Sequence, residues 1–363
     1  MQTAVIESTS RAAVAIPKPW IIGIALAGLL IRLAVLAQTS ALDPKIEDER
    51  QYVRLATSLV RGDGFAWAPG EPTSLRPPLY PALIAALWHV TGEGQLQPIR
   101  AVHVLLSLLT AAFVYAIGRR VWNARVGAIG AAIAWLDPTA IYLNSTILTE
   151  TLFTALLVAF VLATVMVVQT RTRASALICG LALGLGALTR SVLWPVPLLL
   201  CPLLLVLVDD SWRRRLSLAA IVFAGYALVV APWAVRNTRL QQVTTIVDTM
   251  GGMNLRMGNY EYTPEDRMWD AVSMKGEKNW VYALTVEGHP SGDAITEGEK
   301  DKWAQAKAIA YMKANPGRTL RRSIIKFTDF WGLERSFIAG VQQGLYRVPM
   351  AVAAVVAILM LVS

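Results

Sequence analysis

The chain has 363 residues, of which 55% are hydrophobic and only 16% are charged, and its mean hydropathy is +0.47. A soluble domain carries about a quarter charged residues, so this composition excludes an ordinary soluble enzyme. Long apolar runs recur along the chain and predict a polytopic helical membrane protein. The net charge of +9 then reflects basic loops and contact with anionic membrane lipids rather than a nucleic-acid partner.

Cysteine and histidine usage offers little chemistry. Cys179 and Cys201 both lie inside apolar runs, so we expect packing residues rather than a disulfide framework. The histidines, His89, His103 and His289, are scattered without the close spacing of a zinc motif. The sequence therefore predicts neither a disulfide-stapled fold nor a histidine-built metal site.

The apolar runs predict an all-α fold with about eight transmembrane helices. The runs cover residues 19–37, 101–118, 126–143, 150–168, 174–189, 192–208, 216–235 and 346–362. A shorter run, 79–90, predicts an interfacial or re-entrant helix. We expect three parts: a transmembrane catalytic core over 1–236 with a first outer loop over 38–98, an outer loop with interfacial helices over 237–343, and a last transmembrane helix over 344–363.

Arginines mark alternate connections between these runs. They are Arg119, Arg120 and Arg125, then Arg171 and Arg173, then Arg213, Arg214 and Arg215. Short arginine-rich connections face the cytoplasm, whereas the connection 144–149 has no Lys or Arg. The segments 43–81, 144–149, 189–192 and 237–318 therefore share the outer face, where we expect the functional site.

The first outer loop carries two adjacent acids, Asp48 and Glu49, at the start of a segment with helical periodicity. Acids in a first turn favour the helix dipole, which is the simpler interpretation for Glu49. Asp48 has a stronger functional case, because an ionised carboxylate at the membrane edge can act as a general base or hold a divalent cation against a phosphate. Tyr52, on the apolar side of the same helix, is a candidate for the wall of a substrate pocket.

Arg76 precedes Pro77 and Pro78, which hold the backbone extended. It is either an ordinary surface arginine or a guanidinium that pairs with a lipid-linked phosphate and stabilises it as a leaving group. Tyr80 is either an interfacial anchor or a second wall of the substrate pocket. The sequence alone leaves both alternatives open.

Three more charged residues fall at the outer ends of predicted transmembrane helices. Glu150 is either a first-turn acid, with Thr149 as a candidate cap, or part of a wet cavity. Arg190 and Arg236 occur in LTR and PWAVRN, and arginines are unusual in short outer loops. Each is expected to meet either a phosphate or an acid, and each is a candidate for binding a donor phosphate.

The large outer loop contains the run GGMNLRMGNY, 251–260, which is not a phosphate loop because no G-K-[ST] follows. Residues 296–313 predict an amphipathic helix that ends at the run NPG, 315–317. The basic and apolar segment 318–331 predicts a helix on the membrane surface, with its arginines near anionic headgroups.

Several of these segments together resemble the GT-C glycosyltransferases, in particular the protein-mannosyltransferase-like group (glycosyltransferase family 39). That group includes the protein O-mannosyltransferases and the lipid A aminoarabinose transferase. The segments are DERQYVRLATSLVRGDGF (48–65), GEPTSLRPPLYP (70–81), LTETLF (148–153), LTR (188–190), PWAVRN (232–237) and NPGRTLRR (315–322). Each alone is a weak signal, but their order matches the family over most of the chain.

The resemblance implies an inverting glycosyltransferase of the bacterial inner membrane, with its active site on the periplasmic face. It would move a sugar from a polyprenyl-phosphate donor to a lipid, protein or cell-envelope glycan. The family's catalytic acid corresponds to Asp48, with Glu49 beside it, and its basic residue corresponds to Arg76. Some relatives hold a metal through an acid that precedes this basic residue, but Leu75 stands there. No cofactor is therefore expected with certainty, and Asp48 is the candidate ligand if a divalent metal is used.

Family members usually carry further transmembrane helices and a C-terminal domain, so we expect this chain to be a fragment or a short version. The alternative function is a transporter or flippase of lipid-linked saccharides, which would also need outer arginines. A transporter more naturally has mid-membrane ionisable residues and repeated halves, and neither is evident in the sequence. A membrane scaffold with a recognition loop would leave the gathering of acids and arginines on one face unexplained.

Overall fold

The computed structural model describes residues 18–39, 43–265, 268–290 and 295–328. Within these residues the regular structure is helical, apart from one isolated antiparallel bridge between Ala66 and Pro72. The all-α fold predicted from the apolar runs is confirmed. The predicted last transmembrane helix, 344–363, and the end of the predicted surface helix, 329–331, lie outside the described residues.

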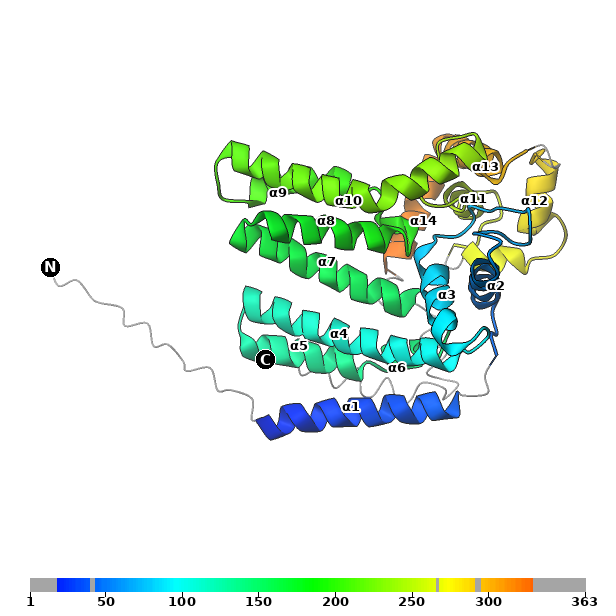
Figure 1. The fold of residues 1–363 in the computed structure, drawn as a ribbon. Helices are drawn as coiled ribbons and strands as arrows, with labels where there is room; N and C mark the ends of the chain where they lie inside the picture. The colour runs from blue at the N-terminus through cyan, green and yellow to red at the C-terminus, as the bar shows by residue number, and fades with distance from the viewer. Residues whose placement is uncertain (1–17, 40–42, 266–267, 291–294, 329–363) are drawn as a thin grey trace.

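Apolar helices lie side by side along most of the molecule (Figure 1). They are α1 (Lys18–Gln38), α4 (Gln97–Val121), α5 (Ala124–Leu136), α7 (Glu150–Thr170), α8 (Arg173–Ala187), α9 (Pro197–Leu207) and α10 (Trp212–Gln241). Helices α4, α7 and α10 are long and apolar enough to cross a membrane, and the others are shorter apolar helices. The chain is thus a polytopic helical membrane protein, and the count of about eight spans stays a prediction.

One predicted span, 126–143, is divided in two. Helix α5 ends at Leu136, and the short helix α6 (Pro138–Leu143) starts directly after Asp137. The Asp137 carboxylate accepts a hydrogen bond from the Thr139 amide at 2.8 Å and so caps α6, while Pro138 occupies the first helical position. A side-chain cap followed by proline is a strong helix start, which explains why the apolar run does not continue as one helix.

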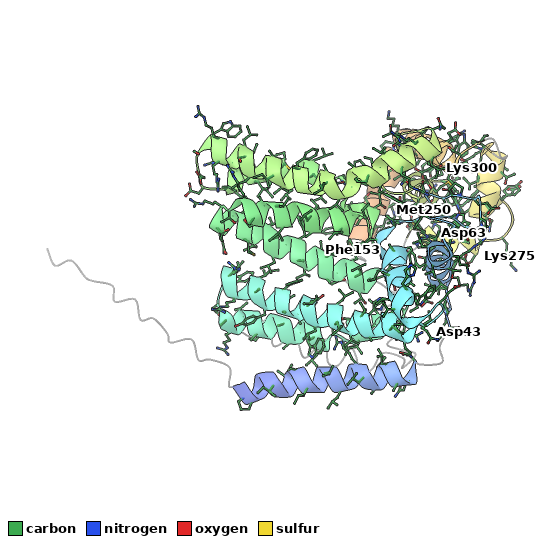
Figure 2. All side chains as sticks on the ribbon, viewed as in Figure 1. Asp43, Asp63, Phe153, Met250, Lys275 and Lys300 are labelled. Atoms are coloured by element: carbon green, nitrogen blue, oxygen red, sulfur yellow. The ribbon has the colours of Figure 1, made fainter. Side chains whose placement is uncertain are left out.

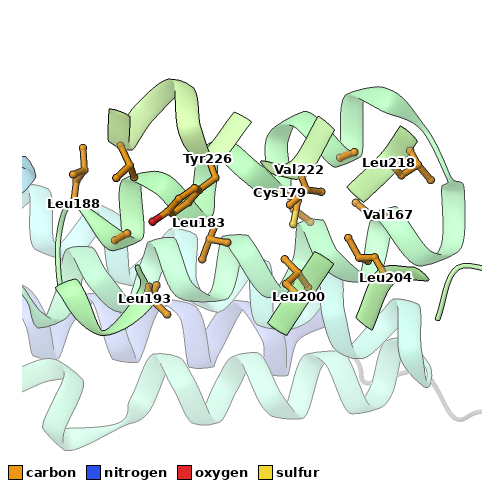
Figure 3. Packing of buried hydrophobic residues seen from close by; sticks show 14 of the residues in the cluster. Val167, Cys179, Leu183, Leu188, Leu193, Leu200, Leu204, Leu218, Val222 and Tyr226 are labelled. Carbon is orange, nitrogen blue, oxygen red and sulfur yellow. The ribbon is translucent and has the colours of Figure 1, made fainter. Parts of the chain in front are cut away.

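The main core lies among α7, α8, α9 and α10, where Leu183, Val222 and Tyr226 are buried against one another (Figure 3). Cys179 is buried in this cluster, and both cysteines are unpaired, as expected of packing residues. Helices α8 and α10 approach closely at Gly180, where an added Cβ would lie 2.1 Å from the Val222 carbonyl oxygen. Small residues allow this kind of contact between membrane helices.

The arginine-rich connections lie together at one end of the helices (Figure 1). The Arg214 guanidinium donates to the Arg171 carbonyl at 2.6 Å, and Gln169 donates to the Arg120 carbonyl at 3.1 Å. Three connections that are far apart in the sequence therefore share one end, as the alternation of arginines predicted.

The opposite end carries the polar segments, including Asp43, Asp63, Met250, Lys275 and Lys300 (Figure 2). We call it the outer end. Its elements are α2 (Glu47–Arg61), α3 (Leu79–Thr91), η1 (Ser191–Leu193), α11 (Gly251–Met257), η2 (Met268–Val272), η3 (Gly276–Lys278), α12 (Trp280–Val286), α13 (Glu297–Ala314) and α14 (Pro316–Thr328).

Helix α2 has the periodic apolar side that the sequence predicts. Tyr52, Leu55 and Ala56 are buried on that side. The side packs on Tyr80 and Ile84 of α3 rather than on lipid, because the two short helices together form one small apolar core. Helix α2 is thereby fixed at the outer end of the transmembrane core.

Helix α14 differs from its prediction as a surface helix with a basic side turned to headgroups. The Arg322 side chain is buried and donates to the carbonyls of Tyr260 and Thr263. Two further arginines of the helix pair with glutamates of the turn 261–265. Arg322 thus packs on protein and the other two arginines form surface ion pairs, whereas Leu320 and Ile324 are exposed. Backbone carbonyls and glutamates close by therefore bind these three arginines.

Candidate active site

One cavity at the outer end gathers most of the residues singled out in the sequence. Its volume is about 270 Å³, and five separate segments and Trp269 form its walls. The lining residues are Asp48, Tyr52, Leu75, Arg76, Pro77, Leu148, Thr149, Glu150, Thr189, Arg190, Ser191, Val192, Asp248, Met250, Asn254 and Trp269. We call this the first cavity. The segments expected to share the outer face meet in it.

An ion pair between Asp48 and Arg76 forms one wall. Nη2 of Arg76 donates to Oδ1 of Asp48 at 2.5 Å, and Nε donates to Oε1 of Gln51 at 2.8 Å. The guanidinium also lies over the Tyr52 ring, 5.6 Å from its centroid. The Arg76 side chain is 15% exposed and that of Asp48 is 46% exposed. The arginine is therefore held in place while the carboxylate stays accessible.

The segment that carries Arg76 is anchored on both sides. The Leu79 amide donates to the Leu188 carbonyl at 3.0 Å, which ties the segment to the end of α8. On the other side, Glu297 of α13 accepts from the Thr73 hydroxyl at 2.7 Å and from the Ser74 amide at 2.8 Å. Since Pro77 and Pro78 have no amide hydrogen, these outside contacts fix the position of Arg76.

A second ion pair, between Glu150 and Arg190, forms another wall. Nη1 of Arg190 donates to Oε1 of Glu150 at 2.7 Å and to the Thr149 hydroxyl at 3.2 Å. Thr149 occupies the N-cap position of α7, but its side chain makes no capping hydrogen bond, so its predicted capping role is wrong. Glu150 begins α7 and Arg190 follows α8, so the packing of these two helices brings the charges together.

Of the two tyrosines predicted to line a pocket, one lines the first cavity and the other is buried behind it. Tyr52 lines the first cavity, and its ring meets the Tyr80 ring edge-on at 5.3 Å. Tyr80 is fully buried behind it and hydrogen-bonds through its hydroxyl to Nε2 of His103 at 3.1 Å. Burial raises the pKa of both phenols, so both are protonated at neutral pH. Tyr80 is thus neither an interfacial anchor nor a wall of the cavity but a support for Tyr52.

Comparison with known proteins places this arrangement in a known architecture. Residues 75–235 match the family model described as dolichyl-phosphate-mannose-protein mannosyltransferase. ArnT from Cupriavidus metallidurans in the apo state matches with a TM-score of 0.50 and 17% identity, over 81% of this chain and 59% of that one. ArnT from the same organism bound to undecaprenyl phosphate matches with a TM-score of 0.54 and 15% identity, over 81% of this chain and 55% of that one. The fold is that of the GT-C glycosyltransferases.

The resemblance stated from the sequence is thereby confirmed at the level of fold. No curated protein sequence matches the chain. The chain spans 55–59% of the length of the ArnT structures. The matched family region contains Arg76, Glu150 and Arg190, whereas Asp48 and Asp248 flank it on either side. The first cavity is therefore lined both by residues that the family model covers and by residues that it does not cover.

Glu49 points away from the first cavity, although it is adjacent to Asp48. Its side chain is buried and accepts from the amides of Lys45 at 2.7 Å, Ile46 at 3.2 Å and Ile147 at 2.8 Å. Successive residues of a helix project about 100° apart, so two adjacent acids rarely serve one site. Glu49 joins the start of α2 to the connection before α7, and its carboxylate is committed to backbone amides.

Arg236 also lies outside the first cavity. One of its terminal nitrogens donates to the Thr73 carbonyl at 2.7 Å and the other to the Phe65 carbonyl at 3.0 Å. Its guanidinium stacks on Trp233, 4.5 Å from the ring centroid. These contacts hold the first outer loop against the end of α10, so Arg236 supports the segment that presents Arg76 rather than facing the cavity.

Asp248 is a cavity residue that the sequence analysis missed. It follows α10 and accepts hydrogen bonds from the Ser191 side chain and the Met250 amide. Burial raises the pKa of its carboxyl group, with those hydrogen bonds opposing the shift. Its one signal in the sequence is its position three residues before the glycine-rich run, which has no chemical pattern of its own. Its place in the first cavity follows only from the three-dimensional fold of the outer loop after α10.

The donor set does not favour a metal site. Within the described ranges, no three His, Cys, Asp or Glu side chains gather closely enough to hold a metal ion. Asp48, the candidate ligand from the sequence, is already paired with Arg76, and Leu75 beside it offers no ligand atom. The side chains that line the first cavity supply carboxylate, guanidinium and hydroxyl groups.

Proposed function

We propose that this protein is an inverting glycosyltransferase that moves a sugar from a polyprenyl-phosphate donor to a hydroxyl-bearing acceptor. One observation carries the proposal: two carboxylate–arginine pairs, Asp48–Arg76 and Glu150–Arg190, line one cavity at the outer end of a GT-C fold. Guanidinium groups bind phosphate oxygens through paired hydrogen bonds, and an accessible carboxylate can take a proton.

Arg76 and Arg190 are the proposed donor phosphate ligands. Both reach the first cavity, and both are already oriented by ion pairs, which limits the entropy lost when a phosphate binds. The ArnT structure with undecaprenyl phosphate supports a polyprenyl phosphate as the lipid part, because it has the same fold. Arg236, also considered from the sequence, is left out because its guanidinium is committed to the first outer loop.

Asp48 is the proposed general base. A phosphate that binds Arg76 competes for the guanidinium and leaves the Asp48 carboxylate free to accept a proton. The acceptor oxygen attacks the anomeric carbon, the bond from that carbon to the phosphate oxygen breaks, and the acceptor proton passes to Asp48. Polyprenyl phosphate leaves with the bonding electrons, stabilised by the arginines. A single displacement of this kind inverts the anomeric configuration.

The proposed location is the bacterial inner membrane, with the first cavity on the periplasmic side. The arginine-rich connections lie at the opposite end of the helices, and such connections face the cytoplasm in most membrane proteins. A lipid-linked donor would then be used where no nucleotide sugar is present. The acceptor would be a lipid, a protein or an envelope glycan at the same surface.

The test is sugar transfer by the purified protein from a panel of labelled polyprenyl-phosphate sugars onto membrane extracts. The account predicts label in an acceptor with one donor and release of polyprenyl phosphate in equal amount. Bound donor that crosses the bilayer without release of the sugar would instead indicate a transporter of lipid-linked saccharides.

A further inference from the structure

A second cavity adjoins the first at the outer end. Its volume is about 260 Å³, and its walls come from the turn after α8, the segment 244–252 and helix α13. Ser191 and Asp248 line both cavities, while every other lining residue belongs to one of them. These two side chains, which hydrogen-bond to each other, therefore form the shared wall.

The turn after α8 places neighbouring residues on different sides of this wall. Arg190 lines the first cavity, Ser191 lines both, and Trp194 lines the second. The Trp194 amide donates to the Ser191 carbonyl at 3.0 Å, and the Tyr226 hydroxyl donates to the Trp194 carbonyl at 2.9 Å. The backbone of Trp194 is thus held on both its amide and its carbonyl side, and the residue is 40% exposed.

Helix α13 forms a firm opposite wall. Oδ1 of Asp301 accepts from the amides of Gly252 at 2.6 Å and Met253 at 3.0 Å, which joins α13 to the start of α11. An added Cβ at Gly252 would lie 2.0 Å from the Asp301 carbonyl oxygen, so only glycine allows this approach. Lys302 and Gln305 of the same helix complete the wall.

The two cavities differ in chemistry. The first has two guanidinium groups, which suit a phosphate, whereas no arginine lines the second. The second offers a tryptophan ring beside amide, hydroxyl and ammonium groups from Gln305, Thr244 and Lys302. A sugar ring has an apolar face that can lie on an aromatic side chain and hydroxyls that need polar partners, so this lining suits a carbohydrate.

We propose that the second cavity binds a carbohydrate unit of the acceptor and that Asp248 and Ser191 direct its hydroxyl into the first cavity. The proposal rests on the proposed function, since a transferase needs two sites that meet at the reacting atoms. Asp248 and Ser191 lie where the sites meet, and both can accept a hydrogen bond from a hydroxyl. They act as positioning residues, and the proton still passes to Asp48.

Cysteine labelling tests the site without requiring turnover. Gln305→Cys places a thiol in the second cavity, and Ala306→Cys places one on the exposed side of the same helix. Methyl glycosides of mannose, glucose and galactose serve as probes. At least one should slow maleimide labelling of the first variant several-fold without changing the second, and Trp194→Ala should abolish that protection. Undecaprenyl phosphate alone should protect neither thiol.

Kinetics provide the second readout. Trp194→Ala and Gln305→Ala should each raise the KM for acceptor about tenfold and change the KM for donor less than about twofold. Absence of glycoside protection, protection by undecaprenyl phosphate alone, or a shifted donor KM would overturn the proposal. Glycoside protection in a protein that transfers no sugar would refute the proposed function while supporting a carbohydrate site here.

Discussion

Arg76 and Asp48 lie 28 positions apart in the sequence, yet Nη2 of the arginine donates to Oδ1 of the aspartate at 2.5 Å. Gln51 accepts a hydrogen bond from Nε of the same guanidinium at 2.8 Å. This second bond keeps the arginine oriented when a bound phosphate replaces Asp48 as the partner of Nη2. Binding of the donor phosphate to Arg76 would thereby free the Asp48 carboxylate, the proposed general base, from its ion pair.

Replacing Arg76 should therefore affect the donor more than the acceptor. Arg76→Ala should lower kcat/KM for the donor by about 100-fold, because it removes a charged hydrogen-bond donor to the leaving phosphate. Arg76→Lys should recover part of the loss, since it keeps the charge but not the paired geometry. Arg61→Ala removes an exposed arginine from the far end of α2 and serves as the control. Equal losses for donor and acceptor would count against the assignment.

Glu49 should matter for stability rather than for turnover. Glu49→Ala leaves the amides of Lys45, Ile46 and Ile147 without their acceptor. The Ile147 amide is the buried one, and a buried unsatisfied amide costs roughly 1–3 kcal/mol. Thermal unfolding in detergent should show a lower Tm than for Glu47→Ala, which removes an exposed acid from the same turn. An unchanged Tm together with a loss of sugar transfer would contradict the structural role and would indicate that Glu49 takes part in the reaction.

Glu297 should act through the segment that carries Arg76. Glu297→Ala removes the acceptor for the Thr73 hydroxyl and the Ser74 amide, so the segment loses its anchor on α13. We expect a raised KM for the donor and a Tm decrease that corresponds to about 1–3 kcal/mol. Glu297→Gln should restore part of both, and Glu277→Ala, at an exposed site, should change neither. A Tm decrease without any change in donor KM would limit Glu297 to a folding role.

Asp248 gives a pH-dependent prediction. Because its pKa is raised in the folded protein, the folded state favours the protonated form, and ionised Asp248 lowers stability at neutral pH. Asp248→Asn should therefore raise Tm at pH 7. The gain should shrink as pH falls through the raised pKa toward the unfolded value of about 3.9. Asp63→Asn, at an exposed turn, should show no such trend. A gain in Tm that grows on acidification would contradict the sign of the shift.

The sequence predicts the parts of this structure that follow from local pattern. The apolar runs locate α4, α7, α8 and α10, and the alternation of arginines places the outer segments together. That alternation is enough to bring Asp48, Arg76, Glu150 and Arg190 to one end, because each lies within or next to a segment that it assigns to the outer face. The break between α5 and α6 has a visible signal, Asp137 before Pro138, that the hydropathy of the run conceals.

What the sequence does not predict depends on side-chain direction and on the fold of long loops. Glu49 and Asp48 are neighbours with the same chemistry, and only the packing of α2 decides which faces the first cavity. Arg236 has the composition and position of a phosphate ligand but is used to hold the first outer loop. Asp248 lines the first cavity through the fold of the long outer loop, where it accepts hydrogen bonds from the Ser191 side chain and the Met250 amide.

The most direct test of the account compares Asp48→Asn with the unaltered protein in sugar transfer from its labelled polyprenyl-phosphate donor. Asparagine keeps the size of the side chain but cannot accept the proton, and loss of a general base costs about 100- to 10,000-fold in rate. The account predicts a loss in this range with Tm and donor binding retained, and full activity for Asp63→Asn. Normal turnover by Asp48→Asn would contradict it.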